Sequence, residues 1–295
     1  MKFVDVKNDV AFHRIFGNAN KTVTLISFLN AVMQLEGHDR ISWVKIENPY
    51  QFPVTTGGKI SILDINATDQ MGRKFVVEIQ VADKEGFVKR AQFYTAREYG
   101  TQIESGDEYP LLRPTHFIGI LNFNLTQNKN YYSHHGTIDF ETGEHLLKDV
   151  QYFFIELLKF RKTIEELQTL MDKWIYFIKN AENIEVMPND IKDEGLQTAY
   201  DAADKHNWSP IEMKEYIKAG IKDADMVQER IFAHKQGKAE GEAEGEAKGK
   251  TEKEVEIVLK PYKKGKTAED ISDFLDIPLV RVKQIIADHK KSQPK

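Results

Sequence analysis

The sequence predicts an α/β fold, in which a mixed β-sheet is flanked by helices and followed by a helical C-terminal region. Three observations favour this fold class. Apolar residues recur at helical spacing before the first predicted strand. Short runs rich in β-branched and aromatic residues then follow one another up to residue 160, interrupted by one amphipathic helix. Beyond that point the helical period returns and continues almost to the end of the chain.

Two helices are predicted in residues 7–35, separated by Gly17 and Asn18. Asn8 is a candidate N-cap of the first helix. Asp9 then falls in the first turn, where a carboxylate interacts favourably with the positive end of the helix dipole. Two interpretations of Asp9 stay open: it serves the helix end alone, or it also belongs to a functional site.

Residues 60–82 predict a β-hairpin. Two runs rich in β-branched and aromatic residues flank a polar turn at residues 70–72, where Gly72 suits the left-handed conformation of a three-residue loop. Such a loop places Asp64 directly opposite Glu78. A loop of two or four residues would instead place Asp64 opposite an odd-numbered residue, so the predicted register is specific.

Acidic side chains stand in these two strands where apolar residues would be expected. Asp64 and Asn66 share one side of the first strand, and Glu78 and Gln80 share one side of the second. Opposed Cβ atoms lie about 4.5–5.5 Å apart. Two ionised carboxylates at that separation repel unless a cation lies between them. The hairpin therefore indicates a divalent cation site, and the alternative is a solvated sheet face on which each acid reaches a nearby Lys or Arg.

The remaining elements of the sheet region follow from the same patterns. Residues 41–54 predict a strand before the hairpin. A long amphipathic helix follows Asp83 and is closed by Gly106. Nearly continuous apolar runs at residues 116–125 and 150–160 are typical of buried strands. One ridge of the predicted helix consists of Phe87, Ala91, Tyr94 and Glu98.

The C-terminal part is helical. Ser209 and Pro210 mark the start of one helix as cap and first residue. Within residues 229–260 glycine recurs every four residues, and each helical glycine costs about 1 kcal/mol relative to alanine. This segment predicts a flexible linker or a fraying helix. Alternatively, its Gly/Ala face could bring two helices together in a homo-oligomer.

Residues 261–295 predict a small helix-turn-helix-like tail. Thr267 and Asp270 form a variant capping box, and Ile277 and Pro278 turn the chain into a second short helix. DNA contact, dimerisation and regulation of the preceding domain all remain open for this tail.

Composition excludes several classes of protein. The chain has 295 residues, no cysteine and a formal net charge of −5. Disulfide frameworks and thiolate metal sites are excluded. The N-terminus does not resemble a signal peptide and no apolar run approaches about 18 residues, so we expect a soluble cytoplasmic protein without membrane contact. The acidic net charge means that any nucleic-acid contact depends on a local patch or a metal.

His134, His135 and His145 could suggest a zinc site. Their spacing fits no common structural zinc site, and consecutive residues of a strand face opposite ways. We therefore interpret the three histidines as loop residues.

Several short stretches carry a family resemblance through their order and spacing. They are NDVAFHRIFG (8–17), SFLNA (27–31), LDI (63–65), VEIQV (77–81), KRAQFY (89–94), HFIGILNFNL (116–125) and FIELLKF (154–160). Together they resemble the PD-(D/E)XK nuclease superfamily, and in particular the Rpn family of recombination-promoting nucleases, also described as putative transposases. The resemblance runs from about residue 5 to the end of the chain.

The resemblance implies a restriction-endonuclease-like mixed sheet flanked by helices in residues 1–160, with a helical region packed on it in residues 161–228. A linker or helix (229–260) and the small tail (261–295) follow. It further implies a metal-dependent DNA endonuclease of the recombination-promoting, transposase-like type, with Mg²⁺ as cofactor and Mn²⁺ as a possible substitute. The alternative is a catalytically inactive, nuclease-like scaffold that acts through protein association. A homo-oligomer formed through the C-terminal helices is expected in either case.

Position by position, the resemblance implies that Asp64 is the metal-binding aspartate and Glu78 the second acid. Gln80 falls where the superfamily pattern has lysine; glutamine can hydrogen-bond but adds no positive charge. With the main-chain carbonyl of Ile79, the two acids form a set of oxygen ligands suited to Mg²⁺. Asp9 is a further candidate catalytic residue.

Two residues of the following helix are candidate DNA contacts. Arg90 and Gln92 lie one turn into that helix, where they could meet phosphates of the passing backbone. The alternative for Arg90 is a solvated position on the helix surface.

Overall fold

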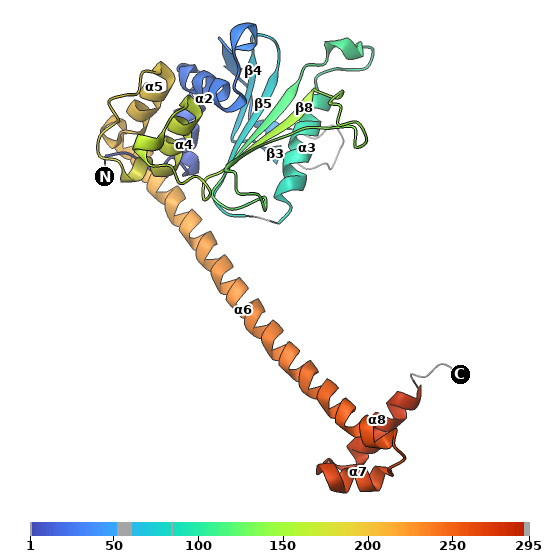
Figure 1. The fold of residues 1–295 in the computed structure, drawn as a ribbon. Coiled ribbons are helices and arrows are strands. Elements are labelled where there is room, and N and C mark those ends of the chain that lie inside the picture. Colours follow the sequence, from blue (N-terminus) through green and yellow to red (C-terminus); the bar gives the residue numbers. More distant parts are fainter. Residues whose placement is uncertain (1, 52–60, 84, 292–295) are drawn as a thin grey trace. The chain divides into compact units, whose positions relative to one another are not determined.

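A six-stranded mixed β-sheet lies at the centre of residues 1–225, the first of two units into which the chain divides; the second is residues 226–295. The computed structural model describes residues 2–51, 61–83 and 85–291 (Figure 1). The strand order is β1-β4-β5-β6-β8-β7, with β6 parallel to β5 and β8 and the other pairs antiparallel. The strands are β1 (Val44–Ile46), β4 (Ile65–Asp69), β5 (Lys74–Gln80), β6 (Thr115–Leu121), β7 (Tyr132–His135) and β8 (Val150–Glu156). The predicted mixed sheet is confirmed.

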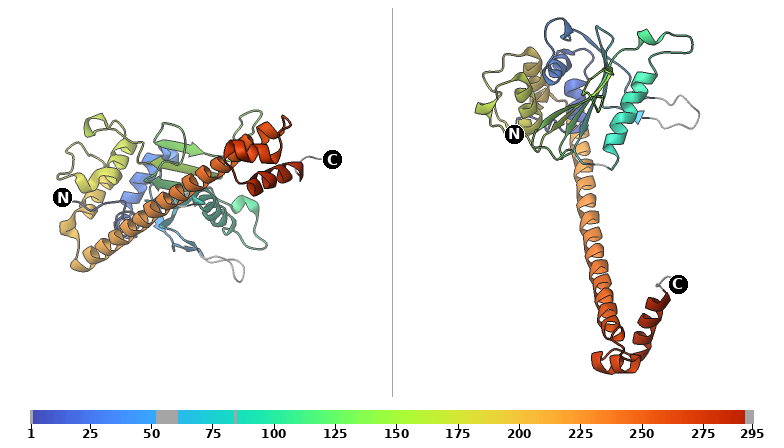
Figure 2. Two further views of the ribbon diagram at one scale, coloured as in Figure 1. Left: turned by 90° about the horizontal axis from the view of Figure 1, so that it is seen from below. Right: turned by 45° about the vertical axis from the view of Figure 1, so that its right-hand side comes forward.

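Helices cover both faces of this sheet. Four of them share one buried core on one face: α1 (Asp9–Phe16), α2 (Val23–Met33), α4 (Leu170–Asn180) and α5 (Glu194–Ala203). Helix α3 (Phe87–Gly100) packs on the opposite face, as Figures 1 and 2 show. The largest side chains of the first core include Phe12, Phe16, Phe28, Trp174 and Tyr200.

Strand alternation sends the side chains of β5 into two different environments. Phe75, Val77 and Ile79 belong to the large core beneath α1, α2, α4 and α5. Val76 faces α3 and packs in the smaller core with Phe87, Ala91 and Tyr94. Glu78 lies two residues after Val76 and therefore points to the same face of the strand. It therefore lies on the α3 side, and the predicted ridge of α3 covers it.

The β4–β5 hairpin has the predicted register. Ile65 pairs with Val77 and Thr68 with Lys74, which leaves residues 70–72 as the loop, and Gly72 has a φ of +79°. The first strand of the hairpin is nevertheless shorter than predicted. Its early part, β3 (Ser61–Ile62), pairs with β2 (Tyr50–Gln51) in a separate two-stranded sheet. Asp64 consequently lies in a bend between β3 and β4 and not inside a strand.

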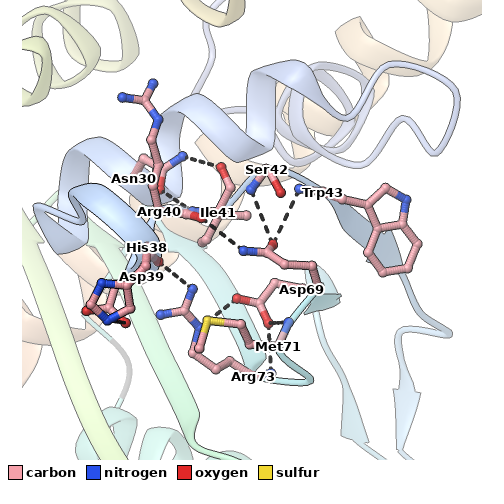
Figure 3. A network of polar contacts seen from close by, with 11 residues as sticks. Asn30, His38, Asp39, Arg40, Ile41, Ser42, Trp43, Asp69, Met71 and Arg73 are labelled. Atoms are coloured by element: carbon pink, nitrogen blue, oxygen red, sulfur yellow. Dashed lines mark hydrogen bonds and ion pairs between the residues drawn. The ribbon is translucent and has the colours of Figure 1, made fainter.

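The turn end of the hairpin is held by the polar network of Figure 3. Asp69 accepts hydrogen bonds from the main-chain N–H of Met71 and Arg73, each at 2.9 Å, and its carboxylate pairs with Arg73 Nε at 2.6 Å. Arg73 also donates to the carbonyl of Asp39 at 2.7 Å. Asn30 of α2 binds both main-chain groups of Ile41 at 2.8 Å. The turn is therefore tied to the chain segment that leads into β1.

Three other predictions need correction. The single strand predicted over residues 41–54 is divided into β1 and β2, and residues 52–54 lie outside the described residues. The helix predicted to run to Gly106 ends at Gly100, because Thr101 already has non-helical dihedral angles. His134 and His135 belong to β7, which pairs with β8, and not to a loop. The pattern of this short edge strand was too polar to identify it.

Caps explain where several helices begin. The Asn8 carboxamide oxygen accepts from the N–H of Val10 and Ala11, as the sequence predicts. A capping box at Thr169 starts α4, eight residues later than the helical period at Arg161 indicates. The intervening residues contain the short 3₁₀ helix η3 (Ile164–Glu166). The other 3₁₀ helices of the described residues are η1 (Gly37–Asp39), η2 (Tyr109–Leu111), η4 (Ala181–Asn183) and η5 (Lys205–Asn207).

Helix α6 (Pro210–Tyr262) begins at the predicted Ser209–Pro210 signal and contains residues 229–260. The second unit also contains α7 (Ala268–Leu275) and α8 (Leu279–Lys291), joined by a turn in which Asp276 has a φ of +54°. The predicted Thr267–Asp270 capping box is present. A small core unites these helices: Val258, Ile271, Val282, Ile285 and Ile286. In the described part of the chain, no helix combines the length and apolar character needed to span a membrane.

Candidate active site

Asp64 and Glu78 meet at the open end of the hairpin, opposite the Gly72 turn. The main-chain N–H of Asp64 donates to Glu78 Oε1 at 3.2 Å. In the other direction, Asp64 Oδ2 accepts from the main-chain N–H of Ile79 at 2.8 Å. Each carboxylate is thus held by the backbone of the other strand, and the two acids converge on one place.

Burial and charge perturb Glu78 strongly. Its side chain lies beneath α3 and the residue is only 6% exposed. Burial, followed by the negative charge of Asp64, raises the pKa of Glu78 to about 8. The N–H of Asp64 and the positive charge of Arg90 act in the opposite direction. The two acids therefore lie close enough for the charge of Asp64 to disfavour ionisation of Glu78.

The main chain of Ile79 faces the same place. Its N–H reaches Asp64, and a strand residue directs its N–H and its C=O toward the same neighbouring strand. Strand β4 starts only at Ile65, which pairs with Val77, so the carbonyl of Ile79 lies beyond the end of the β4 ladder. Two carboxylates and this carbonyl form a donor set of oxygen atoms alone. That chemistry fits a hard divalent cation.

Gln80 and Arg90 form a second pair beside the acids. Gln80 is the last residue of β5, and its side-chain oxygen accepts a hydrogen bond from the guanidinium of Arg90. The guanidinium carbon of Arg90 lies 5.4 Å from the centre of the Phe87 ring. Arg90 is half-buried, whereas Gln92 is exposed on α3. The structure therefore brings Arg90 to the acids and leaves Gln92 on the surface.

Asp9 lies in the first turn of α1 and is exposed. Its charge is close enough to raise the pKa of Glu78, although it is the weakest of the contributions to that shift. Asn8, and not Asp9, caps the helix. Asp9 thus contributes negative charge to the rim of the site, and its position in the first turn serves the helix dipole at the same time.

Tyr94 is a residue of this site that the sequence analysis placed only on a packing ridge. It is 8% exposed, and burial raises the pKa of its hydroxyl, followed by the charge of Glu78. One turn further along α3, Glu98 Oε2 accepts from Gln51 at 2.9 Å and from Asn66 at 3.2 Å. The ridge spacing on α3 was the available signal: Arg90, Tyr94 and Glu98 recur every four residues.

The histidines do not form a metal site. His134 stacks on Phe153 with ring centres 4.2 Å apart, and His135 contacts Phe154 on the other face of the sheet. Among residues 2–51, 61–83 and 85–291, no group of three or more His, Asp or Glu side chains is arranged to hold a metal ion. The hairpin offers two such side chains, Asp64 and Glu78, together with the main-chain carbonyl of Ile79.

A cavity of about 1290 Å³ lies away from these acids, beside the α1–α2 connection and α5. Its one arginine, Arg14, donates to the carbonyl of Asn207 at 2.6 Å, pairs with Glu212 and lies 4.5 Å over the Trp208 ring. These contacts show that the guanidinium of Arg14 stabilises the packing of this region. Neither Asp64 nor Glu78 lines this cavity.

Comparison with known proteins points to one family. Residues 6–229 match the family model described as PD-(D/E)XK nuclease family transposase. The match contains both acids, Gln80 and all of α3. Searches of the curated proteins and of the solved structures found no match.

Proposed function

The chain belongs to the PD-(D/E)XK nuclease family of transposases, and from this premise we propose that it is a metal-dependent DNA endonuclease. Family membership supports a nuclease or transposase-like function with DNA as substrate. The observation that carries the finer proposal is the convergence of Asp64 and Glu78, with the pKa of Glu78 raised to about 8 by burial and by the second acid. Because ionising both carboxyl groups is unfavourable without a nearby positive charge, the pair is suited to binding a cation.

In this proposal, Asp64, Glu78 and the carbonyl of Ile79 hold Mg²⁺, with Mn²⁺ as a possible substitute. The three oxygen donors support this choice, because Mg²⁺ favours carboxylate and carbonyl ligands and retains several waters. When bound, the ion would supply Lewis-acid polarisation of the scissile phosphate and lower the pKa of a water molecule.

The protein groups have separate tasks around that centre. Glu78 would hold the cation as a carboxylate and lose its proton to solvent, since a positive charge offsets the cost imposed by burial and by Asp64. Gln80 lies two residues along the same strand face and hydrogen-bonds at the reaction centre. Asp9 adds negative charge at the rim. On the surface of α3, Gln92 is a phosphate contact for DNA that approaches the site.

One observation favours a second candidate function. Gln80 occupies the position at which the superfamily pattern has lysine, and an amide carries no charge with which to stabilise the reacting phosphate. A nuclease-like scaffold that no longer cleaves DNA, and that acts through protein association, would tolerate this residue.

A plasmid-nicking assay separates the two functions. Purified protein is incubated with supercoiled DNA in Mg²⁺, in Mn²⁺ and in EDTA. We expect nicking with either metal, none with EDTA, and none for Asp64→Ala. Asp201→Asn, which removes an exposed carboxylate of α5, should retain full activity. Equal nicking by wild type and Asp64→Ala, with circular dichroism confirming both folds, would end the nuclease proposal.

A further inference from the structure

We propose that Gln80 and Arg90 act as one donor unit, in which Gln80 presents its amide NH₂ to the scissile phosphate and Arg90 fixes that orientation and supplies the positive charge. This inference rests on the proposed nuclease function. It assigns Gln80 as a hydrogen-bond donor to the phosphate and not as an acceptor that holds the attacking water. Arg90 becomes a positioning residue and not a mobile DNA contact.

The orientation follows from the chemistry of the two side chains. A guanidinium has only donors, so Arg90 can pair with the carbonyl end of an amide and not with its NH₂ end. Gln80 Oε1 is the atom that accepts from Arg90. The NH₂ group therefore points away from Arg90. Among the described residues it has no hydrogen-bond partner, which leaves two donors available to a ligand.

The position of Gln80 directs those donors to the reaction centre. Gln80 and Glu78 lie two residues apart on β5 and share the face covered by α3. Side chains on one strand face are about 7 Å apart at this spacing, which leaves room for a phosphate between the amide and a cation on the acids. The amide donors would then face a non-bridging oxygen of a phosphate that lies beside the two acids.

Arg90 is held in place from behind. Its guanidinium lies 5.4 Å over the Phe87 ring, and Phe87 is only 3% exposed. The charge also reaches the acids, since Arg90 lowers the pKa of both Glu78 and Tyr94 against the opposing effect of burial. An arginine packed in this way cannot follow a DNA backbone along the surface. It can polarise the amide of Gln80, to which it donates a hydrogen bond.

The pair thereby combines two properties that neither side chain has alone at the reaction centre. The amide supplies donors with fixed direction, and the cation behind it strengthens them in a partly buried setting. The effect is largest when charge develops on the phosphate, so it should appear in kcat and leave KM nearly unchanged. A lysine would combine donor and charge in one side chain, which suggests the test.

The test is a double-mutant cycle in the plasmid-nicking assay, with the full-length protein. Arg90→Met removes the charge and frees the amide to rotate, so kcat should fall about 100-fold. The kcat of Gln80→Lys should also fall about 100-fold. The new ammonium is repelled by the guanidinium of Arg90, and a lysine side chain offers no oxygen that could accept a hydrogen bond from it. The kcat of the double variant should recover to within about tenfold of wild type, since the new ammonium is then no longer repelled by a guanidinium. A double variant no faster than the slower single variant would overturn the inference.

A matched control isolates the pairing from charge in general. Lys89→Met removes a positive charge from the neighbouring, exposed position of α3 and leaves Arg90 in place. It should change KM only. A loss of kcat equal to that of Arg90→Met would show that α3 acts through its overall charge, and would contradict the proposed unit.

A measurement without catalysis keeps this inference distinct from the nuclease proposal. In protein labelled with ¹⁵N-glutamine, the side-chain NH₂ signals of Gln80 are identified by their loss in Gln80→Glu. In wild type we expect them to be rigid, and in Arg90→Met to shift and become mobile. Unchanged signals would overturn the pairing even if wild type nicks DNA. A shift in a protein that never nicks DNA would retain the pairing and reject only the nuclease.

Discussion

The two ends of the β4–β5 hairpin carry the same kind of residue and use it in opposite ways. At the turn, Asp69 is compensated completely: its carboxylate binds two main-chain N–H groups and pairs with Arg73 at 2.6 Å, with the Asp69 side chain 0% exposed. At the open end, Asp64 faces another acid, Glu78, across the same register. Asp69 stabilises the fold, whereas Asp64 destabilises the ionised form of Glu78.

This difference shows how to distinguish a structural from a functional acid within one pair of strands. Asp69 is the last residue of β4, and Asp64 directly precedes its first residue. What separates them is the side chain that each meets across the hairpin: Arg73 for Asp69 and Glu78 for Asp64. A buried carboxylate beside an arginine and N–H donors is stabilised in its ionised form, whereas a carboxylate that is buried beside a second acid is destabilised in that form. The following predictions test that contrast.

The largest effect is expected on catalysis. Asp64→Asn removes a ligand charge and should lower the nicking rate by at least about 1000-fold, since the centre would lose a group that acts directly on the reacting phosphate. Asp69→Asn should leave the rate of the folded fraction within about threefold of wild type. Single-turnover nicking, corrected for the folded fraction by circular dichroism, measures both. Similar losses for the two variants would break the contrast.

The reverse order is expected for stability. Asp69→Asn leaves Arg73 buried without its carboxylate and should lower the free energy of unfolding by about 3–5 kcal/mol. Asp64→Asn relieves the charge on Glu78 and should not lower it. Urea denaturation of both variants in EDTA gives the comparison. An Asp64→Asn variant as unstable as Asp69→Asn would assign Asp64 a structural role.

The open end should also make stability depend on pH. In the unfolded chain Glu78 ionises near the ordinary value of 4.5, and in the folded protein its pKa is about 8. Between these values the folded state binds more protons than the unfolded state, so stability falls as pH rises, by up to about 1.4 kcal/mol per pH unit for one proton.

Thermal unfolding in EDTA from pH 5 to pH 8 measures this slope. Glu78→Gln cannot ionise and should be less sensitive to pH than wild type by the contribution of that one group. Added Mg²⁺ should raise the melting temperature of wild type more at pH 8 than at pH 6, because the ionised form binds the cation. Parallel pH profiles for wild type and Glu78→Gln would show that Glu78 is not perturbed as described.

The smallest effect concerns the turn that sets the register. Gly72 has a φ of +79°, and an added Cβ would lie 3.1 Å from Cγ of Arg113. Gly72→Ala should cost about 1–2 kcal/mol of unfolding free energy through backbone strain. Gly143→Ala is the matched control, since Gly143 has a φ of +74° but no atom near the added Cβ. A larger cost at Gly143 would contradict the contribution of the close approach.

Several features could be predicted from the sequence because they depend on neighbouring residues. Gly72 at the end of a three-residue turn gave the register that places Asp64 opposite Glu78. The helical spacing of Phe87, Ala91 and Tyr94 identified the face of α3 that packs on the sheet. Side-chain caps at Asn8 and Thr267 marked helix starts correctly. The bend at Asp64 could not be predicted, because it results from β3 pairing with β2 in a different sheet.

The sequence by itself determined the register of the hairpin, the faces of its strands and the ridge of α3, since turn geometry and side-chain periodicity are local. Only the tertiary structure decided that Glu78 would be buried, that Arg90 would bind Gln80, and that Asp69 would pair with Arg73 while Asp64 would meet Glu78. These outcomes depend on which distant elements pack together. Burial sets the dielectric environment of a charge and packing chooses its partner, and neither is contained in the local pattern.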